Sequence, residues 1–260
     1  MKMKKYIKFS PLAFFSAVFL LTLTIPTYDY DLFFHLKSGE IISKLGIIHH
    51  DVFSYNTQGR EWFPYEWLFQ ITVYNIEKIF GALGLKLFLS SLITLLILVF
   101  YKILRKAFNI NQPISMFSSL FFLYSIYTFL TLRPHIPAYT LILTYILLIL
   151  LYIVKNRNFL LLTIPLSLIW ANFHGSIIIN IYLFFSYAII SLLKKDLHKA
   201  KTLGLFTVFT AFLSVLPPIG LVQYRLLIYL IQTRGLTAKF IDEWHPLNEL
   251  PRDNNSFYIP

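Results

Sequence analysis

Residues 158–193 read NFLLLTIPLSLIWANFHGSIIINIYLFFSYAIISLL, and these 36 positions contain no Asp, Glu, Lys or Arg. A single α-helix of that length would measure about 54 Å at ~1.5 Å per residue, whereas the hydrocarbon core of a bilayer is ~30 Å thick. The polar group Asn172–Gly175 lies near the middle of the stretch. The stretch therefore predicts two membrane-crossing helices, Phe159–Ala171 and Ser176–Leu193, joined by a turn at that polar group.

The rest of the chain has the same apolar character. Of its 260 residues, 57% are hydrophobic and only 13% are charged, whereas soluble domains are typically about a quarter charged. This composition excludes a soluble enzyme, a disordered chain and a collagen-like fibre. The chain contains no Cys, which excludes disulfides, thiol catalysis and zinc sites built from Cys.

Five further stretches are charge-poor and long enough to cross a bilayer. They are Phe9–Thr27, Gly81–Tyr101, Pro113–Leu132, Ile136–Val154 and Thr202–Ile219. The first is expected to stay as a helix rather than to be cleaved as a signal peptide, because no small-x-small cleavage site precedes Tyr28. The sequence thus predicts an all-α, polytopic membrane protein with about seven transmembrane helices, forming one membrane domain over residues 1–260.

The basic residues orient these spans. With the N-terminus inside, the short inner segments hold thirteen Lys and Arg and a single acid, Asp196, while the outer side holds eleven acids and ten bases. The inner ones are Lys2, Lys4, Lys5, Lys8, Lys102, Arg105, Lys106, Lys155, Arg157, Lys194, Lys195, Lys199 and Lys201. This positive-inside pattern predicts a cell-membrane protein with a cytoplasmic N-terminus and an extracytoplasmic active face. It also accounts for the net charge of +11 without a nucleic-acid partner.

Residues 28–80 form the expected first outer loop. Two pieces of it, Phe33–Leu45 and Tyr65–Phe80, have helical apolar periodicity, are rich in aromatic residues, and are too short or too charged to span. A third such piece, Leu221–Gln232, follows the seventh span. We expect all three to be amphipathic helices that lie in the membrane interface.

The chemistry is expected on the outer face, which carries eleven of twelve acids and six of seven His. None of the predicted spans contains an acid, which disfavours an ion-coupled transporter, because such proteins usually keep an ionisable group near mid-membrane. The sequence has no phosphate-binding Gly-rich loop, no zinc-protease motif and no nucleophile elbow. A substrate delivered through the bilayer therefore fits better than a soluble nucleotide.

The densest polar cluster runs from Asp29 to Lys37, directly after the first span. A carboxylate at the bilayer surface is a suitable general base for a hydroxyl acceptor. Asp29 and Asp31, or Asp31 with His35, are also suitable oxygen and nitrogen ligands for a divalent cation. The structural alternative is that these are ordinary juxtamembrane residues, with Asp31 as the N-cap of the next helix.

Other outer residues carry similar alternatives. Asp51, in His49-His50-Asp51, is a metal ligand by type or the start of a turn. Arg133 follows a span and precedes a proline, so it either clamps a lipid phosphate or anchors its helix in the interface. His174 and Asn172 lie at a turn reached by a short helix, so they either line the floor of an outward-facing pocket or form a satisfied turn.

Residues 29–40, DYDLFFHLKSGE, resemble the D-x-D-x-W-W-H-L-x-x-G stretch of bacterial multi-pass proteins of the C-type glycosyltransferase (GT-C) superfamily. The chain departs from that pattern in having Phe33 and Phe34 in place of two Trp. Further pieces continue the pattern in order along nearly the whole chain. They are His50–Tyr55, Trp62, Glu66–Leu68, Leu132–Pro134, Trp170–Gly175 and Glu243–Pro246.

The resemblance implies a GT-C fold and a glycosyltransferase that uses a polyprenyl-phosphate-linked sugar. It places the catalytic role on Asp31 or Asp29, with a divalent metal ion needed in some branches only. The donor phosphate would be held by Arg133 and Arg225, and the pocket would be lined by His35, Lys37, His174 and Asn172. Related proteins are longer and carry more spans, so the chain is expected to be the N-terminal part of a longer protein.

Two other classes of function stay open at this point. One is a non-catalytic membrane scaffold or lipid-binding subunit of a cell-envelope polymer assembly. The other, disfavoured by the absence of acids from the predicted spans, is a transporter or flippase. Both keep membrane lipid as a partner.

Overall fold

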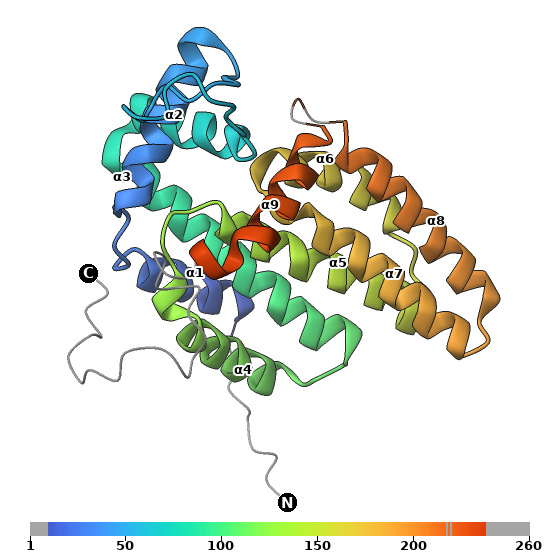
Figure 1. Cartoon of the computed structure of the whole chain (residues 1–260). Coiled ribbons are helices and arrows are strands. Elements are labelled where there is room, and N and C mark those ends of the chain that lie inside the picture. The colour runs from blue at the N-terminus through green and yellow to red at the C-terminus, as the bar shows by residue number, and fades with distance from the viewer. Residues whose placement is uncertain (1–9, 217, 219, 238–260) are drawn as a thin grey trace, which may run out of the picture.

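The computed structural model describes residues 10–216, 218 and 220–237, and their regular structure is helical, as predicted (Figure 1). The described residues form nine α-helices, with one isolated antiparallel bridge between His50 and Glu61. The helices are α1 Pro11–Thr22, α2 Tyr30–Leu45, α3 Trp67–Lys102, α4 Gln112–Ser125, α5 His135–Lys155, α6 Thr163–Phe173, α7 Ile178–Leu193, α8 Leu197–Ser214 and α9 Val222–Thr237.

Three helical stretches are long and apolar enough to cross a membrane. They are Trp67–Ala107, His135–Lys155 and Gly175–Leu193. Two more, Pro11–Thr22 and Leu160–Phe173, are apolar but shorter. The protein is therefore a possible multi-pass membrane protein with three candidate transmembrane helices among the residues that the structure describes.

Several predicted boundaries are confirmed. α5 matches the predicted Ile136–Val154 to within one residue at each end. The long apolar run of residues 158–193 is split at His174, where extended backbone separates α6 from the turn Gly175–Ile177 that leads into α7. α3 is broken at Gly81, whose φ of 62° and ψ of −159° lie outside the helical region, at the predicted border between an amphipathic piece and a span.

Other boundaries were predicted wrongly. α4 ends at Ser125 instead of Leu132, because the chain then makes a short 3₁₀ turn and buries Leu130 and Leu132 in a loop that leads to α5. α8 covers Leu197–Ser214 instead of Thr202–Ile219, because Asp196 caps it early by accepting a hydrogen bond from the Lys199 amide at 3.1 Å.

α1 also ends before the predicted Thr27. Its last residue is Thr22, and the Thr22 and Thr24 hydroxyls each donate to a main-chain carbonyl three residues earlier. These contacts finish the helix before Pro26, which disfavours helical backbone at the residue before it.

α2 and the first part of α3 stand side by side and form an arm beside the α5–α8 bundle (Figure 1). Gly39 makes this crossing close, because a Cβ there would lie 2.2 Å from the Gln70 carbonyl oxygen and 2.6 Å from Tyr74 Cβ. Only glycine leaves room for that approach. This packing brings the start of α2, which carries Asp31, next to the start of α3, which Glu66 precedes.

The core has two main clusters. One is built from α1, α3 and the loop before α5, and includes Val18, Leu89 and Ile93. The other surrounds Trp170 and includes Phe184 and Tyr145. The Tyr145 hydroxyl donates a hydrogen bond to the Thr163 carbonyl at 2.7 Å. Large apolar side chains such as those of Phe117, Phe121, Leu205, Val208 and Phe212 remain exposed, which suits contact with lipid.

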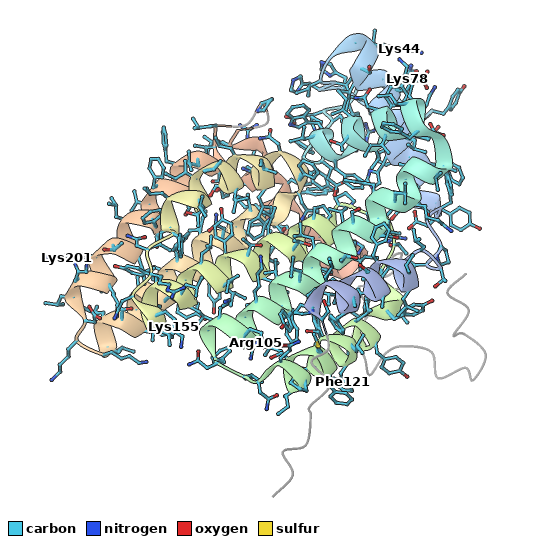
Figure 2. The ribbon with its side chains drawn as sticks, turned by 180° about the vertical axis from the view of Figure 1, so that it is seen from behind. Lys44, Lys78, Arg105, Phe121, Lys155 and Lys201 are labelled. Carbon is cyan, nitrogen blue, oxygen red and sulfur yellow. The ribbon has the colours of Figure 1, made fainter. Side chains whose placement is uncertain are left out.

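The two ends of the helices differ in charge. Figure 2 shows Arg105, Lys155 and Lys201 along one edge of the molecule, and Lys44 and Lys78 at the opposite corner, on the arm formed by α2 and α3. The acids Asp29, Asp31 and Glu66 lie at the starts of α2 and α3. These carboxylates therefore lie at other helix ends than Arg105 and Lys155, which stand where α3 and α5 finish.

Candidate functional site

The site begins with the N-terminus of α2. Asp29 has extended backbone, and its Oδ1 accepts a hydrogen bond from the Leu32 amide at 2.8 Å, so Asp29 is the N-cap. The predicted alternative that Asp31 caps this helix is wrong, because Asp31 already lies in the first turn. The Asp31 side chain is consequently 54% exposed, whereas the Asp29 side chain is 16% exposed.

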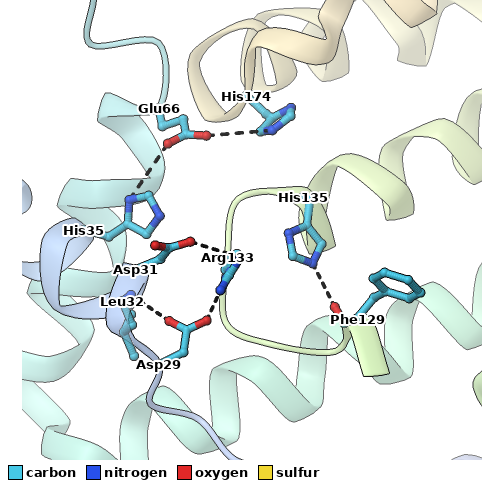
Figure 3. A network of polar contacts seen from close by, with 9 residues as sticks. All are labelled: Asp29, Asp31, Leu32, His35, Glu66, Phe129, Arg133, His135 and His174. Carbon is cyan, nitrogen blue, oxygen red and sulfur yellow. Dashed lines mark hydrogen bonds and ion pairs between the residues drawn. The ribbon is translucent and has the colours of Figure 1, made fainter. Parts of the chain in front are cut away.

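Arg133 joins both carboxylates, although it lies about a hundred residues further along the chain. Its Nε donates to Asp29 Oδ2 at 2.7 Å, and its Nη1 lies 3.0 Å from Asp31 Oδ2 (Figure 3). The early end of α4 makes this possible, since the loop before α5 carries Arg133 back to α2. A charged guanidinium and two carboxylates thus form one network with a formal charge of −1.

Glu66, the residue that precedes α3, lies between two histidines. Its Oε2 is 3.9 Å from His35 Nδ1 and its Oε1 is 3.8 Å from His174 Nε2 (Figure 3). Burial, aided by the nearby charge of Asp31, raises the pKa of Glu66 to about 8. Burial lowers the pKa of His35 and of His174 to about 4. At neutral pH this group is therefore mostly uncharged, and Glu66 carries a proton.

Sequence reasoning included Glu66 only within the family resemblance and did not name it as a site residue. The signal that could have found it is its setting, an acid between Tyr65 and Trp67 directly before an apolar helix. Buried His35 Nδ1 has no hydrogen-bond partner among the described residues. Because buried polar atoms are normally hydrogen-bonded, this atom marks a position where a bound molecule would find a partner.

Asn172 and His174 connect the end of α6 to the start of α3, where Glu66 lies. Asn172 Oδ1 accepts from Trp67 Nε1 at 2.8 Å, and Asn172 Nδ2 donates to the Leu168 carbonyl at 2.7 Å. His174 Nδ1 lies 2.7 Å from the Ser176 hydroxyl. The Asn172 contact ties α6 to the start of α3, which keeps the His174 ring beside Glu66.

Two predicted site residues lie elsewhere. Lys37 is 62% exposed on α2, and its Nζ pairs with Glu40 Oε2 at 2.8 Å. Arg225 is exposed on α9, next to Leu226. The structure therefore brings Asp29, Asp31, Arg133, His35 and His174 into one region, with Asn172 behind them, and leaves Lys37 on an outer helix face.

Asp51 forms its own local structure. Its Oδ1 accepts hydrogen bonds from the Phe53 and Ser54 amides, and its Oδ2 accepts from the Thr57 hydroxyl. These hydrogen bonds hold the pKa of Asp51 well below its usual range. Within residues 10–216, 218 and 220–237, no group of three or more His, Asp or Glu side chains is placed to hold a metal ion.

A pocket of about 190 Å³ opens beside Glu66. Its walls combine the segment before α3 with the first turn of α3, with α2 and with one residue of α9, and most of the side chains are aromatic. They are Phe34, Trp62, Phe63, Tyr65, Glu66, Gln70 and Leu226. A protonated acid in an aromatic wall can donate a hydrogen bond to a polar group of a ligand whose apolar part lies against the rings.

No protein-family model matches the chain, and neither the curated proteins nor the solved structures contain a significant match to it.

Proposed function

We propose that the chain is a membrane glycosyltransferase that transfers a sugar from a polyprenyl-phosphate carrier to an acceptor on the extracytoplasmic face. The observation that carries this proposal is the meeting of Asp29, Asp31 and Arg133 at one end of apolar helices. Carboxylates can accept the proton of a hydroxyl group, and an arginine can bind a phosphate. The order of the motifs along the chain supports the same reaction.

The proposal includes a seven-crossing topology with a cytoplasmic N-terminus. The crossings would be α1, the part of α3 after Gly81, and α4 to α8, with the shorter helices completed by their flanking residues. The positive-inside distribution supports this topology. A cysteine placed at exposed Gln58 should react with an impermeant maleimide added outside cells, and one placed at exposed Lys201 should not. Labelling of position 201 from outside would reject the topology.

Asp31 is the proposed general base, because it is the more exposed carboxylate, whereas Asp29 is occupied with capping α2 and holding Arg133. The acceptor hydroxyl oxygen attacks the anomeric carbon while the bond from that carbon to the phosphate oxygen breaks on the opposite face. The hydroxyl proton moves to Asp31, and the bonding electron pair leaves with the polyprenyl phosphate. The anomeric configuration is inverted.

Arg133 is the proposed contact for the donor phosphate, with Arg225 of α9 as a second cation. A phosphate that engages Arg133 Nη1 would compete with Asp31 for the same donor. Loss of the Arg133 contact raises the proton affinity of a carboxylate. Donor binding would therefore make Asp31 a stronger base at the moment when the acceptor must be deprotonated.

His35, His174 and Asn172 are the proposed polar lining behind the reacting groups, and the aromatic pocket beside Glu66 would hold an apolar or sugar face of a substrate. Glu66 would act as a hydrogen-bond donor, since burial keeps it protonated at neutral pH. Membrane lipid surrounds the helices in this proposal, and no step passes through a metal ion.

The test compares Asp31→Asn with Lys37→Gln in membranes supplied with labelled polyprenyl-phosphate sugars. Lys37 is the matched control, because it lies on the same helix, is exposed and pairs only along the surface with Glu40. Asp31→Asn should reduce transfer of label by ~100-fold or more, the usual contribution of a general base. Lys37→Gln should keep near-normal transfer. Equal transfer by both variants would remove Asp31 from the base role.

A lipid-binding subunit without catalysis is the second candidate, and the Arg133 network favours it in one respect. Both carboxylates are already paired with Arg133. In this second candidate the network has a structural role alone, which is to tie α2 to the loop before α5. That function predicts binding of polyprenyl phosphate with no transfer in any condition. Asp31→Asn would then change the free energy of unfolding and leave lipid binding intact.

A further inference from the structure

A second pocket, of about 360 Å³, lies at the basic end of the molecule between the C-terminal ends of α3 and α5. Its lining residues in the described chain are Arg105, Lys106, Asn109, Lys155 and Arg157. Four of these five are cations and none is an acid. Arg105 and Lys155 are labelled at this edge in Figure 2.

The two helix ends that form the pocket are built alike. α3 continues into the π-helical turn Ile103–Ala107, and the Ile110 amide then donates to the Leu104 carbonyl at 3.0 Å. At the end of α5 the Arg157 amide donates to the Leu151 carbonyl, also at 3.0 Å. In each turn the hydrogen bond joins residues six positions apart, and an asparagine with positive φ lies between them, Asn109 in one turn and Asn156 in the other. Helix C-caps commonly use such residues. The basic side chains therefore project from two defined turns.

The side-by-side packing of these helices makes the cations converge. Val99 and Ile103 pack against Leu147 in a small apolar cluster that joins the end of α3 and its π-helical turn to α5. Arg105 is half-buried and its Nη1 donates to the Ile110 carbonyl, which fixes one cation in place. The positive-inside pattern accounts for basic residues in these loops, but it does not account for their convergence on one cavity.

The charge at this place is larger than the fold itself requires. Each helix C-terminus carries roughly −0.5 of an elementary charge, so two ends neutralise about one cation. Four cations line the pocket, which leaves an excess of about three positive charges. Like charges held together repel one another, and an anion bound among them removes that repulsion.

We propose that this pocket binds a phosphate group, supplied either by the head group of an anionic phospholipid or by a free phosphate in solution. Arginine and lysine are the side chains that bind phosphate in proteins, and the two arginines can do so through paired N–H donors. The volume lies in the range of small-molecule sites. The pocket opens at the end of the apolar helices, where phospholipid head groups would lie in a membrane.

The experiment uses the purified full chain in a neutral detergent, titrated with phosphatidylglycerol or phosphatidylcholine and followed by native mass spectrometry. The pocket variant is Lys106→Gln with Arg157→Gln, because both side chains are exposed and neither donates to the backbone in the described structure. The control is Lys194→Gln with Lys201→Gln, which removes the same charge from exposed positions outside the pocket. Thermal unfolding verifies that both variants fold. If the pocket variant does not fold, the single substitution Lys155→Gln takes its place.

The unmodified chain should retain phosphatidylglycerol in preference to phosphatidylcholine. The pocket variant should weaken that binding by about tenfold or more, the loss expected from removing charge-assisted contacts, and the control by less than about twofold. Inorganic phosphate separates the two sources: free phosphate is the ligand if it binds more tightly than the lipid, and the lipid is the ligand if phosphate competes only weakly. Equal weakening in pocket variant and control, or no preference for an anion in the unmodified chain, would overturn the proposal.

Discussion

The two charged ends of this molecule are built in opposite ways. At one end Arg133 is paired with Asp29 and Asp31, so charges of both signs meet at contact distance. At the other, Arg105 and Arg157 converge with two lysines and no acid among the pocket residues that the structure describes. Paired charges satisfy each other within the fold, whereas unbalanced charges need a partner from outside it. The first arrangement is the one that we propose to organise reacting groups, and the second is the one that we propose to bind an anion.

The comparison predicts responses of very different size to the loss of one arginine. Arg133→Met would leave two neighbouring carboxylates without their cation, at positions where Asp29 is only 16% exposed. We expect a loss of about 2–3 kcal/mol in the free energy of unfolding, below the cost for fully buried pairs because Asp31 is half-exposed. Arg157→Met should cost less than about 0.5 kcal/mol, because it relieves repulsion. Unfolding by SDS titration in mixed micelles measures both.

A second substitution, Asp29→Asn, tests whether the lower free energy of unfolding of Arg133→Met comes from uncompensated charge. Asp29→Asn added to Arg133→Met removes one of the uncompensated charges, so the double variant should be more stable than Arg133→Met alone. If instead the two losses simply add, the pair is not coupled, and the network contributes no electrostatic stability.

Conversion of Arg133 to lysine tests ligand binding rather than folding. Lysine keeps the positive charge but cannot present two N–H groups in one plane. Loss of such a charge-assisted contact costs about 1.5–3 kcal/mol, or roughly 10- to 150-fold in affinity for a polyprenyl-phosphate sugar. Donor affinity measured by titration into micelles should fall within that range for Arg133→Lys. If affinity stays unchanged in both Arg133→Lys and Arg225→Lys, neither arginine binds the donor phosphate.

The sequence predicts well those features of this protein that depend on neighbours along the chain. The long charge-free stretch of residues 136–154 predicts α5, and the backbone freedom of Gly81 coincides with the break in α3. The polar residues around His174 predict the division of the long apolar run. In each case the signal lies within a few residues of the feature that it specifies.

Features that depend on distant segments were missed. The early end of α4 cannot be predicted from residues 113–132, which are uniformly apolar or weakly polar, because the loop that follows is held by Arg133 and its contacts with α2. Glu66 is one acid among eleven on the predicted outer side, and its place between His35 of α2 and His174 at the end of α6 depends on how distant segments pack. Local sequence patterns contain no information on which loop reaches which helix.

The buried carboxyl group of Glu66 makes the stability of the fold depend on pH. Its pKa is about 8 in the folded chain against an ordinary value of 4.5, so the unfolded chain releases this proton first as pH rises. Between these values Glu66 therefore makes folding less favourable with increasing pH. His35 and His174 act in the opposite sense, because their pKa is lowered to about 4 from 6.5, and stability rises with pH across that lower window.

The two windows overlap only below the ordinary histidine pKa, so stability should be greatest near pH 6.5 and should fall above it. From there to pH ~8 the loss due to Glu66 is about 2 kcal/mol, since each unit of pH across one such proton costs ~1.36 kcal/mol. Glu66→Gln keeps the shape and removes the ionisation, so its stability should stay level over the same range. The measurement is the unfolding midpoint of both proteins in micelles at several pH values. If the unmodified chain shows no decline above pH 6.5, Glu66 ionises freely in the folded state, and its proposed role as a hydrogen-bond donor is wrong.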